Sequence, residues 1–414
     1  MCWEDEMQER VARWLAFWQE SEADLDWVAG ESACRLVSVS EYAGEQLRRY
    51  PMWWDFVCAP RDWRNYDFML QWQEFSAQVG ADEEALMRAL RLFKHRHQVA
   101  LIEAVVSRRL EQVDFLYALS ALAQCLLQAA YDWHWQALVE RYGYPLDGAG
   151  EKMGMVILGM GKLGGWELNF SSDVDLMFAF AEEGMTQAGV GQRSLEHSVF
   201  FRKLAQKVIY ALDAVTVEGF VYRVDMRLRP FGQSGALAIT FEAMAQYYVR
   251  HGRDWERYAL MKARAVAGDK KGGAVLLGRL QGFMYRRQLD YQTLEAITQM
   301  KLGINRQIQK EGMARHLKLG VGGIREAEFC VQAMQMIYGG FIRCCRGRIF
   351  CRRCGIWRVW SCGLRRRRRR CLRRICCCGR WKMRCSLIRK NKYIICLRRR
   401  RIGNVWRWRR GFCQ

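Results

Sequence analysis

The first part of the chain, to about residue 142, has the spacing of apolar residues that predicts helices. Phe115, Leu119, Leu122 and Leu126 recur at intervals of four, three and four residues, which places them on one helix face. The helical character continues to residue 142, where glycine and proline break it. We therefore predict an N-terminal helical region over residues 1–150.

Between residues 151 and 245 the pattern changes to that of an α+β core with a mixed sheet. Two short apolar runs, 156–158 and 176–180, are typical of buried strands. A helix is predicted over 194–212, after the second run. The fold class predicted for the chain is therefore α+β, with helical regions flanking the core.

A third strand is predicted over residues 220–229, where apolar and polar residues alternate strictly. One face of this strand is apolar. The other face presents one acid among cations, namely Arg223, Asp225, Arg227 and Arg229. Pro230 ends the strand because proline cannot donate to a sheet ladder.

Helical patterning returns over residues 246–340, which we assign to a second helical region. Its clearest helices are predicted over 254–266 and 324–337, with a glycine-rich loop at 320–323 before the latter. Residues 341–414 form a separate segment of unusual composition.

That segment carries the charge of the chain. It holds 27 Lys and Arg, no Asp or Glu, and 12 of the 17 cysteines, so residues 1–340 have a net charge of −4 although the whole chain has +23. Ordinary domains carry charges of both signs. We therefore interpret residues 341–414 as a disordered or aberrant tail, translated out of frame. The alternative is a nucleic-acid-binding arm, since clustered Arg neutralises phosphate and interleaved Trp can stack on bases.

The tail has a consequence for the helix that precedes it. If the tail replaces further helices, the apolar face of residues 329–337 is left partly uncovered, which predicts low solubility.

The five cysteines of residues 1–340 are scattered, which fits a reducing compartment. No secretory signal and no apolar run of about 20 residues was recognised. We expect a cytoplasmic protein with no membrane partner.

A glycine-rich stretch, 159–165, follows the first predicted strand. Gly159, Gly161 and Gly164 satisfy the dinucleotide-binding pattern, but only seven residues separate Gly165 from Asp173, too few for the crossover helix of that fold. A nucleoside-triphosphate-binding P-loop is excluded as well, because Leu163 stands where that loop needs Ser or Thr.

Carboxylates after this stretch predict a metal site. Asp173 and Asp175 lie two residues apart at the head of a strand and so share a face. Two such oxygen ligands can hold Mg²⁺, and Asp225 on the third strand can supply a third. Three acids around two metal ions suit an in-line displacement at phosphorus. A lone Asp-x-Asp is usually a solvated strand end, and it is the ordered combination of glycines and acids that favours the catalytic interpretation.

The remaining candidates follow from charge and backbone access. Gly164 and Gly165 allow amide groups to approach phosphate closely. Arg227 and Arg229 share the face of Asp225 and are predicted to neutralise phosphate oxygens. The candidate list closes with two secondary phosphate contacts, Lys162 and Ser172.

At these residues the chain resembles a known family. Gly-Met-Gly-Lys-Leu-Gly-Gly-Trp-Glu-Leu-Asn-Phe-Ser-Ser-Asp-Val-Asp-Leu (159–176) and Tyr-Arg-Val-Asp-Met-Arg-Leu-Arg-Pro-Phe-Gly (222–232) look like the signatures of the bifunctional glutamine synthetase adenylyltransferase and adenylyl-removing enzymes. Further similar blocks are Gly-Arg-Asp-Trp-Glu-Arg-Tyr (252–258) and Lys-Leu-Gly-Val-Gly-Gly-Ile-Arg-Glu (318–326). The resemblance covers about the first 340 residues.

The resemblance implies a nucleotidyltransferase core of the polymerase-beta-like kind and the adenylyl-removing, N-terminal half of such an enzyme. That half uses inorganic phosphate to lift AMP from a tyrosine of glutamine synthetase and releases ADP, with Mg²⁺ held by Asp173, Asp175 and Asp225. Partners implied are glutamine synthetase and the PII signal protein, and nucleic acid only non-specifically through the tail. We expect the second, ATP-using module to be missing. Two alternatives stay open: a nucleotidyltransferase acting on RNA, and an inactive truncated product.

Overall fold

The computed structural model describes most of the chain before residue 341 and two short segments near its end. The described residues are 3–20, 26–77, 82–285, 324–340, 346, 396–402 and 405–411, with isolated positions between 295 and 306. The Cα positions separate into two compact units, Met1–Ile356 and Trp357–Gln414. In the second unit, β8 (Cys396–Ile402) and β9 (Val405–Gly411) pair as antiparallel strands. The first unit mixes helices with a sheet and confirms the α+β class.

The N-terminal region is helical, as predicted. Its helices are α1 (Trp3–Gln19), α2 (Glu31–Val39), α3 (Glu41–Arg49), the short η1 (Pro51–Trp53), α4 (Trp54–Cys58), α5 (Phe68–Ser76), α6 (Glu83–Val106) and α7 (Gln112–Tyr142). Several begin at residues that cap a helix: the side chains of Ser40, Asp67 and Asp82 each accept hydrogen bonds from backbone amides in the first turn. Gly143, with a φ of 76°, ends α7 where the sequence predicted the break.

The long helix α7 forms a central part of the core. Leu119, Leu122 and Leu126 are fully buried, which confirms the predicted apolar stripe. Among the described residues, α7 is long and apolar enough, by length and composition alone, to cross a membrane. We had expected no apolar run of that length. In this structure 56% of its most apolar window is buried, and the helix packs against α6, α9 (His197–Asp213) and β7 (Arg264–Gly268).

The sheet of this unit is mixed, as predicted. Its strands are β2 (Val156–Gly159), β3 (Val174–Phe180), β5 (Val224–Asp225), β6 (Ala238–Thr240) and β7. Strands β2 and β3 are antiparallel and so are β2 and β7, whereas β5 and β6 each run parallel to β3. A separate two-stranded sheet joins β1 (Tyr144–Pro145) to β4 (Thr186–Gln187). The strand β3 therefore has β2 on one edge and both β5 and β6 on the other.

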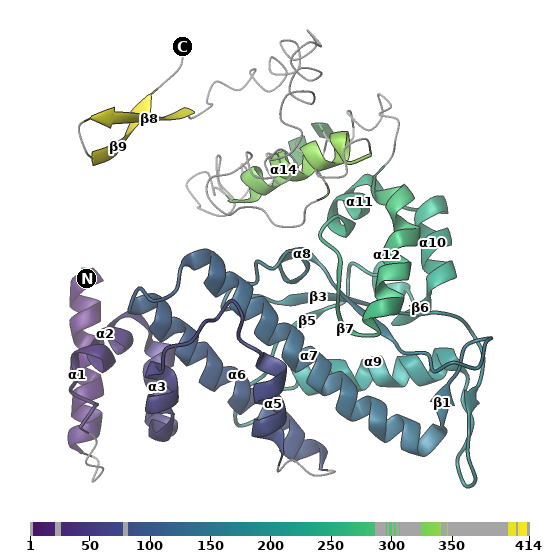
Figure 1. Ribbon diagram of the computed structural model, residues 1–414, viewed down its shortest axis with the longest axis horizontal. Helices are drawn as coiled ribbons and strands as arrows, with labels where there is room; N and C mark the ends of the chain where they lie inside the picture. The colour runs from purple at the N-terminus through teal and green to yellow at the C-terminus, as the bar shows by residue number, and fades with distance from the viewer. Residues whose placement is uncertain are drawn as a thin grey trace. The chain divides into compact units, whose positions relative to one another are not determined.

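Successive residues of β2 and β3 enter different cores, because side chains of a strand alternate between faces. Ile157, Phe178 and Phe180 belong to the core built with α7 and α9. Leu158 and Met177 belong to a second core with α10 (Phe241–Arg250) and α12 (Lys270–Met284). Figure 1 shows α7 and α9 on one side of the sheet and α10 and α12 on the other. Burial on both faces explains why both strands are continuous apolar runs.

Two predicted elements are wrong in extent. The strand predicted over 220–229 is reduced to β5, because the amides of Val221 and Tyr222 both donate to the carbonyl of Leu212 and the chain turns after Asp225. The helix predicted over 254–266 ends with α11 (Asp254–Leu260), and the following residues form β7 instead. Pairing with buried β2 outweighs the local helical pattern there. The sheet thus extends past the boundary we predicted at residue 245.

The helix predicted over 324–337 is confirmed as α14 (Ile324–Tyr338), while its preceding glycine loop lies outside the described residues. The expectation that its apolar face lies uncovered is wrong for Phe329, Val331 and Met336, which are buried. The Phe329 ring stacks on that of Tyr258, 6.0 Å between centroids. The helix is also tied by an ion pair from Glu328 to Lys262, 3.1 Å apart.

Candidate active site

The glycine-rich stretch after β2 forms a tight turn into the short helix α8 (Gly161–Gly164). The Met160 amide donates to the carbonyl of Asp175 at 2.8 Å, which fixes the turn beside β3. Gly161 has a φ of 50°, and a Cβ there would lie 2.9 Å from Oδ2 of Asp175. Glycine at this position therefore leaves space that the Asp175 carboxylate uses.

The glycine pair that we predicted to contact phosphate is packed inside the protein. The amides of Gly164 and Gly165 donate to the carbonyls of Met160 and Gly161, at 3.0 and 3.1 Å. A Cβ on Gly164 would lie 2.1 Å from the carbonyl oxygen of Lys262. The structure thus shows a packing reason for the glycine, and phosphate binding by the pair stays a prediction. Phosphate contacts by Lys162, in α8, and by Ser172, just before β3, also stay predictions. Both residues are half-buried.

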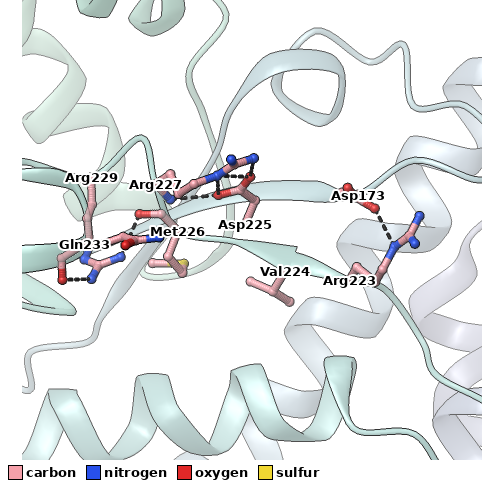
Figure 2. Close-up of a pocket in the computed structure, with 8 residues that line it drawn as sticks. All are labelled: Asp173, Arg223, Val224, Asp225, Met226, Arg227, Arg229 and Gln233. Carbon is pink, nitrogen blue, oxygen red and sulfur yellow. Dashed lines mark hydrogen bonds and ion pairs between the residues drawn. The ribbon is translucent and has the colours of Figure 1, made fainter.

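Two of the three predicted acids lie side by side. In the parallel pair of β3 and β5, Asp175 is directly opposite Asp225. Asp173 precedes β3, where the Val174 amide donates to the Arg223 carbonyl at 2.9 Å. The predicted convergence of acids from neighbouring strands is thus found for Asp175 and Asp225. Figure 2 shows Asp173 and Asp225 at a pocket of about 360 Å³.

The two outer acids are each paired with an arginine. Asp173 Oδ1 accepts a hydrogen bond from Arg223 Nε at 2.7 Å. Asp225 is bound by Arg227 through Nε, at 2.8 Å to Oδ2, and its Oδ1 also accepts the Arg227 backbone amide at 2.8 Å. Arg223 was not among our predicted site residues, although the alternation over 220–229 placed it on the same face as Asp225.

The electrostatics of the acids differ accordingly. The side-chain hydrogen bond from Arg227 holds the pKa of Asp225 below its ordinary value. Burial, together with the negative charges of Asp225 and Asp173, raises the pKa of Asp175 to about 6. Negative charge is therefore less stable on Asp175 than on Asp225, and a cation beside Asp175 would stabilise it.

Arg229 binds the backbone around the turn after β5, and the phosphate contact that we predicted for it stays a prediction. Its guanidinium donates to three backbone carbonyls, from Nη1 to Met226 at 2.8 Å, from Nη2 to Gln233 at 2.9 Å and from Nε to Gly235 at 3.2 Å. It therefore holds the turn after β5 together. Arg229 also lines the pocket, with Asp173, Arg223, Val224, Asp225, Met226, Arg227 and Gln233.

The segment that leads into β5 is held by the helix α6. Arg91 is fully buried and donates to the carbonyls of Met87, Ala211, Ala214 and Gly219. Lys94 Nζ donates to the Phe220 carbonyl at 2.9 Å, and His95 Nε2 lies 2.9 Å from the Glu218 carbonyl. We call these three α6 residues and the carbonyls of 211–220 the α6 junction. It fixes the start of the segment that carries Asp225.

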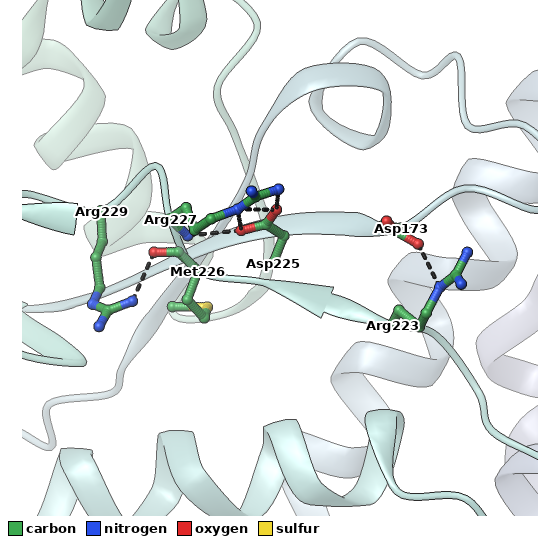
Figure 3. Close-up of polar contacts among 6 residues, drawn as sticks. All are labelled: Asp173, Arg223, Asp225, Met226, Arg227 and Arg229. Carbon is green, nitrogen blue, oxygen red and sulfur yellow. Dashed lines mark hydrogen bonds and ion pairs between the residues drawn. The ribbon is translucent and has the colours of Figure 1, made fainter. Parts of the chain in front are cut away.

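The donor set fits a hard divalent cation. Asp175 and Asp225 offer carboxylate oxygens from adjacent strand positions, and Gly161 leaves room beside Asp175. Among the residues that the structure describes, no three His, Cys, Asp or Glu side chains are close enough together to hold an ion as they stand. Asp173 turns to Arg223 instead (Figure 3).

Comparison with known proteins covers this whole site. A family described as glutamate-ammonia ligase adenylyltransferase matches residues 30–278, and a second, GlnD PII-uridylyltransferase, matches residues 298–364. The second match continues past Gly340, but it is to a different family from the one whose resemblance we predicted to end there.

Two curated proteins named bifunctional glutamine synthetase adenylyltransferase/adenylyl-removing enzyme are also similar. That of Pseudomonas aeruginosa is 49% identical over 261 residues, which is 63% of this chain and 26% of the relative. That of Pseudomonas putida is 48% identical over 266 residues, 64% of this chain and 27% of the relative. The chain thus spans about a quarter of the length of the relatives it matches.

Proposed function

Because the chain belongs to the glutamate-ammonia ligase adenylyltransferase family, we propose that its site removes adenylyl groups from glutamine synthetase. In this reaction inorganic phosphate attacks the phosphorus of AMP-tyrosine and the bond to the tyrosine oxygen breaks. ADP is released, and the phosphate proton passes to the tyrosine oxygen, which restores the hydroxyl group on glutamine synthetase. The observation that carries the proposal is the register of Asp175 opposite Asp225 beside the Gly161 turn. Both activities appear in the names of the relatives. Residues 159–176 and 222–232 resemble signatures of the whole family, and it is their position in the chain that favours the adenylyl-removing module.

In the proposed reaction Asp175 and Asp225 would hold Mg²⁺, with Asp173 as a further ligand. The bound ion would neutralise charge that builds on phosphoryl oxygens. Arg227, whose side chain is 74% exposed at the pocket, binds an anionic oxygen of phosphate or AMP. The α6 junction and Arg229 keep β5 in place, so that Asp225 stays opposite Asp175. The core that carries these groups would have a nucleotidyltransferase fold of the polymerase-beta-like kind.

The test uses adenylylated glutamine synthetase, phosphate and Mg²⁺, with ADP release as the measurement. Asp225→Asn keeps the size of the side chain but removes its charge, and we expect release to fall about a thousandfold, roughly 4 kcal/mol in the barrier. Glu242→Gln is the control, since Glu242 is a surface acid paired with Arg279. Wild-type rates in Asp225→Asn would reject the site.

Partners and place in the cell follow from the same proposal. Glutamine synthetase is the protein substrate, PII is a further regulatory partner, and both place the protein in the cytoplasm. Co-purification of the full chain with adenylylated and unmodified glutamine synthetase tests the first partner directly. Preference for the unmodified form would argue against removal.

An RNA substrate is the alternative, favoured only by the 27 Lys and Arg of residues 341–414. The two proposals differ in what activity requires. ADP release from adenylylated glutamine synthetase without RNA supports adenylyl removal, whereas nucleotide incorporation that depends on RNA supports the alternative. A chain with neither activity would be the inactive product.

A further inference from the structure

Each outer acid of the candidate active site already has a cation beside it, supplied by the chain itself. Figure 3 shows Arg223 turned to Asp173 and Arg227 turned to Asp225, from opposite ends of the same short segment. Both guanidiniums are largely exposed, with 62% and 74% of their side chains accessible, and both line the pocket. A divalent ion that binds these acids therefore competes with guanidinium groups for the carboxylate oxygens.

The replacement is energetically feasible because the pairs are exposed. Ion pairs in contact with water contribute little, since water solvates the separated charges almost as well. A freed guanidinium does not need to move far, because the same pocket is where phosphate oxygens would lie in the proposed reaction. Its planar fork matches phosphate geometry in two hydrogen bonds. Arg229 cannot take part in this way, because three backbone carbonyls already hold it.

We propose that Arg223 and Arg227 exchange partners: they neutralise Asp173 and Asp225 until a divalent cation binds, and then bind the phosphate that enters with it. This inference rests on the proposed function, because it takes the three acids as the cation site. It assigns Arg223 to anion binding, a role that the alternation pattern alone did not indicate. It also means that cation and phosphate strengthen each other's binding, since one releases the group that the other needs.

The first test measures binding of Mn²⁺ alone to the full chain, with a reducing agent present for the cysteines, by titration calorimetry or by the spin resonance of free Mn²⁺. Arg223→Ala and Arg227→Ala remove competing cations, and we expect each to tighten Mn²⁺ binding about threefold to tenfold. Arg279→Ala removes a comparable surface partner of Glu242, away from the candidate site, and should leave the affinity unchanged. Equal or weaker Mn²⁺ binding in both site variants would overturn the exchange.

The second test measures binding of inorganic phosphate with and without saturating Mn²⁺. In the wild-type chain Mn²⁺ should tighten phosphate binding about tenfold, and Arg223→Ala should lose most of this coupling. The basic residues of 341–414 bind phosphate as well, but their contribution is the same with and without the cation and is measured in Asp175→Asn. A coupling in Arg223→Ala as large as in the wild type would show that Arg223 does not bind the anion.

The two proposals fail in different ways. If Asp175→Asn binds Mn²⁺ as well as the wild type does, the acids are not the cation site and the proposed function fails. If Asp175→Asn loses Mn²⁺ but Arg223→Ala and Arg227→Ala change neither Mn²⁺ affinity nor phosphate coupling, the cation site stands and only the exchange is wrong.

Discussion

The α6 junction and the candidate active site both place arginines beside the segment around β5, yet they use them in opposite ways. Arg91 of the junction is fully buried, and its partners are backbone carbonyls of the protein. Arg223 of the site is mostly exposed, and its partner is a carboxylate that a ligand can also bind. A buried cation is costly to leave unpaired, whereas an exposed one exchanges partners at little cost.

This difference separates the residues that hold the site from those that act in it. The carbonyls that Arg91 binds include those of Ala211 and Gly219, which lie 120 and 128 residues away in the sequence. The junction therefore connects the N-terminal helices to the strand that carries Asp225. Burial and carbonyl partners mark a positioning role, while exposure and acid partners mark a role toward ligands.

The sharpest way to break the comparison is to remove each arginine in turn. Arg91→Met keeps the apolar stem but leaves several buried carbonyls without a donor, so we expect a loss of about 3 kcal/mol in the free energy of unfolding. Arg223→Met, the matched variant, should change it by less than about 0.5 kcal/mol. Urea unfolding followed by circular dichroism measures both. Similar losses in the two variants would mean that burial does not separate their roles.

A second, smaller effect sharpens the comparison through pH. Burial, with help from the positive charge of Arg91, lowers the pKa of Lys94 to about 8. The folded state thus holds this proton more weakly than the unfolded chain, so the penalty is full below pH 8 and fades as pH rises toward 10.5.

Lys94→Met, which keeps the length of the side chain, should abolish this rise of stability with pH. Relative to the variant, we expect the wild type to become more stable by about 1 to 2 kcal/mol between pH 7 and pH 9.5. Urea unfolding at the two pH values checks it. Because every other titrating group is shared, parallel pH profiles for the two proteins would show that folding does not lower the pKa of Lys94.

Sequence patterns predicted the parts of this fold that depend on local spacing. The stripe through Leu119, Leu122 and Leu126 and the apolar runs of β2 and β3 were recognised because one face, or both, of each element is buried. Asp173 and Asp175 were predicted from the same kind of signal, since their spacing at the start of β3 is a local property. Placing Asp225 opposite Asp175 needed only that two predicted strands be neighbours.

The parts that were missed depend on contacts between distant residues. The strand β7 looked helical because pairing with β2, over 100 positions earlier, decides its conformation. The strand predicted over 220–229 is short because Leu212 takes the amides of Val221 and Tyr222. Alternation therefore could not show that the turn after Asp225 sends Arg229 to backbone carbonyls and leaves Arg223 at the pocket.

The smallest expected effect has the opposite sign, and it belongs to the site. Burial raises the pKa of Asp175 to about 6, above its ordinary value of 3.8, with Asp225 and Asp173 adding to the shift. The folded state thus prefers the protonated acid, so this contribution to stability is present below about pH 4 and is lost as pH rises through 6.

Asp175→Asn is neutral at every pH and should therefore be more stable than the wild type at pH 7.5. We expect about 1 kcal/mol, less than the full pKa shift would give because the side chain is only partly buried. Thermal unfolding in the presence of a chelator measures the difference, which should shrink toward zero near pH 4. Removing the Arg91 charge from the α6 junction should destabilise the protein; here, removing the Asp175 charge should stabilise it while it abolishes cation binding. A variant that is less stable at pH 7.5 would show that Asp175 is held for structure rather than for a ligand.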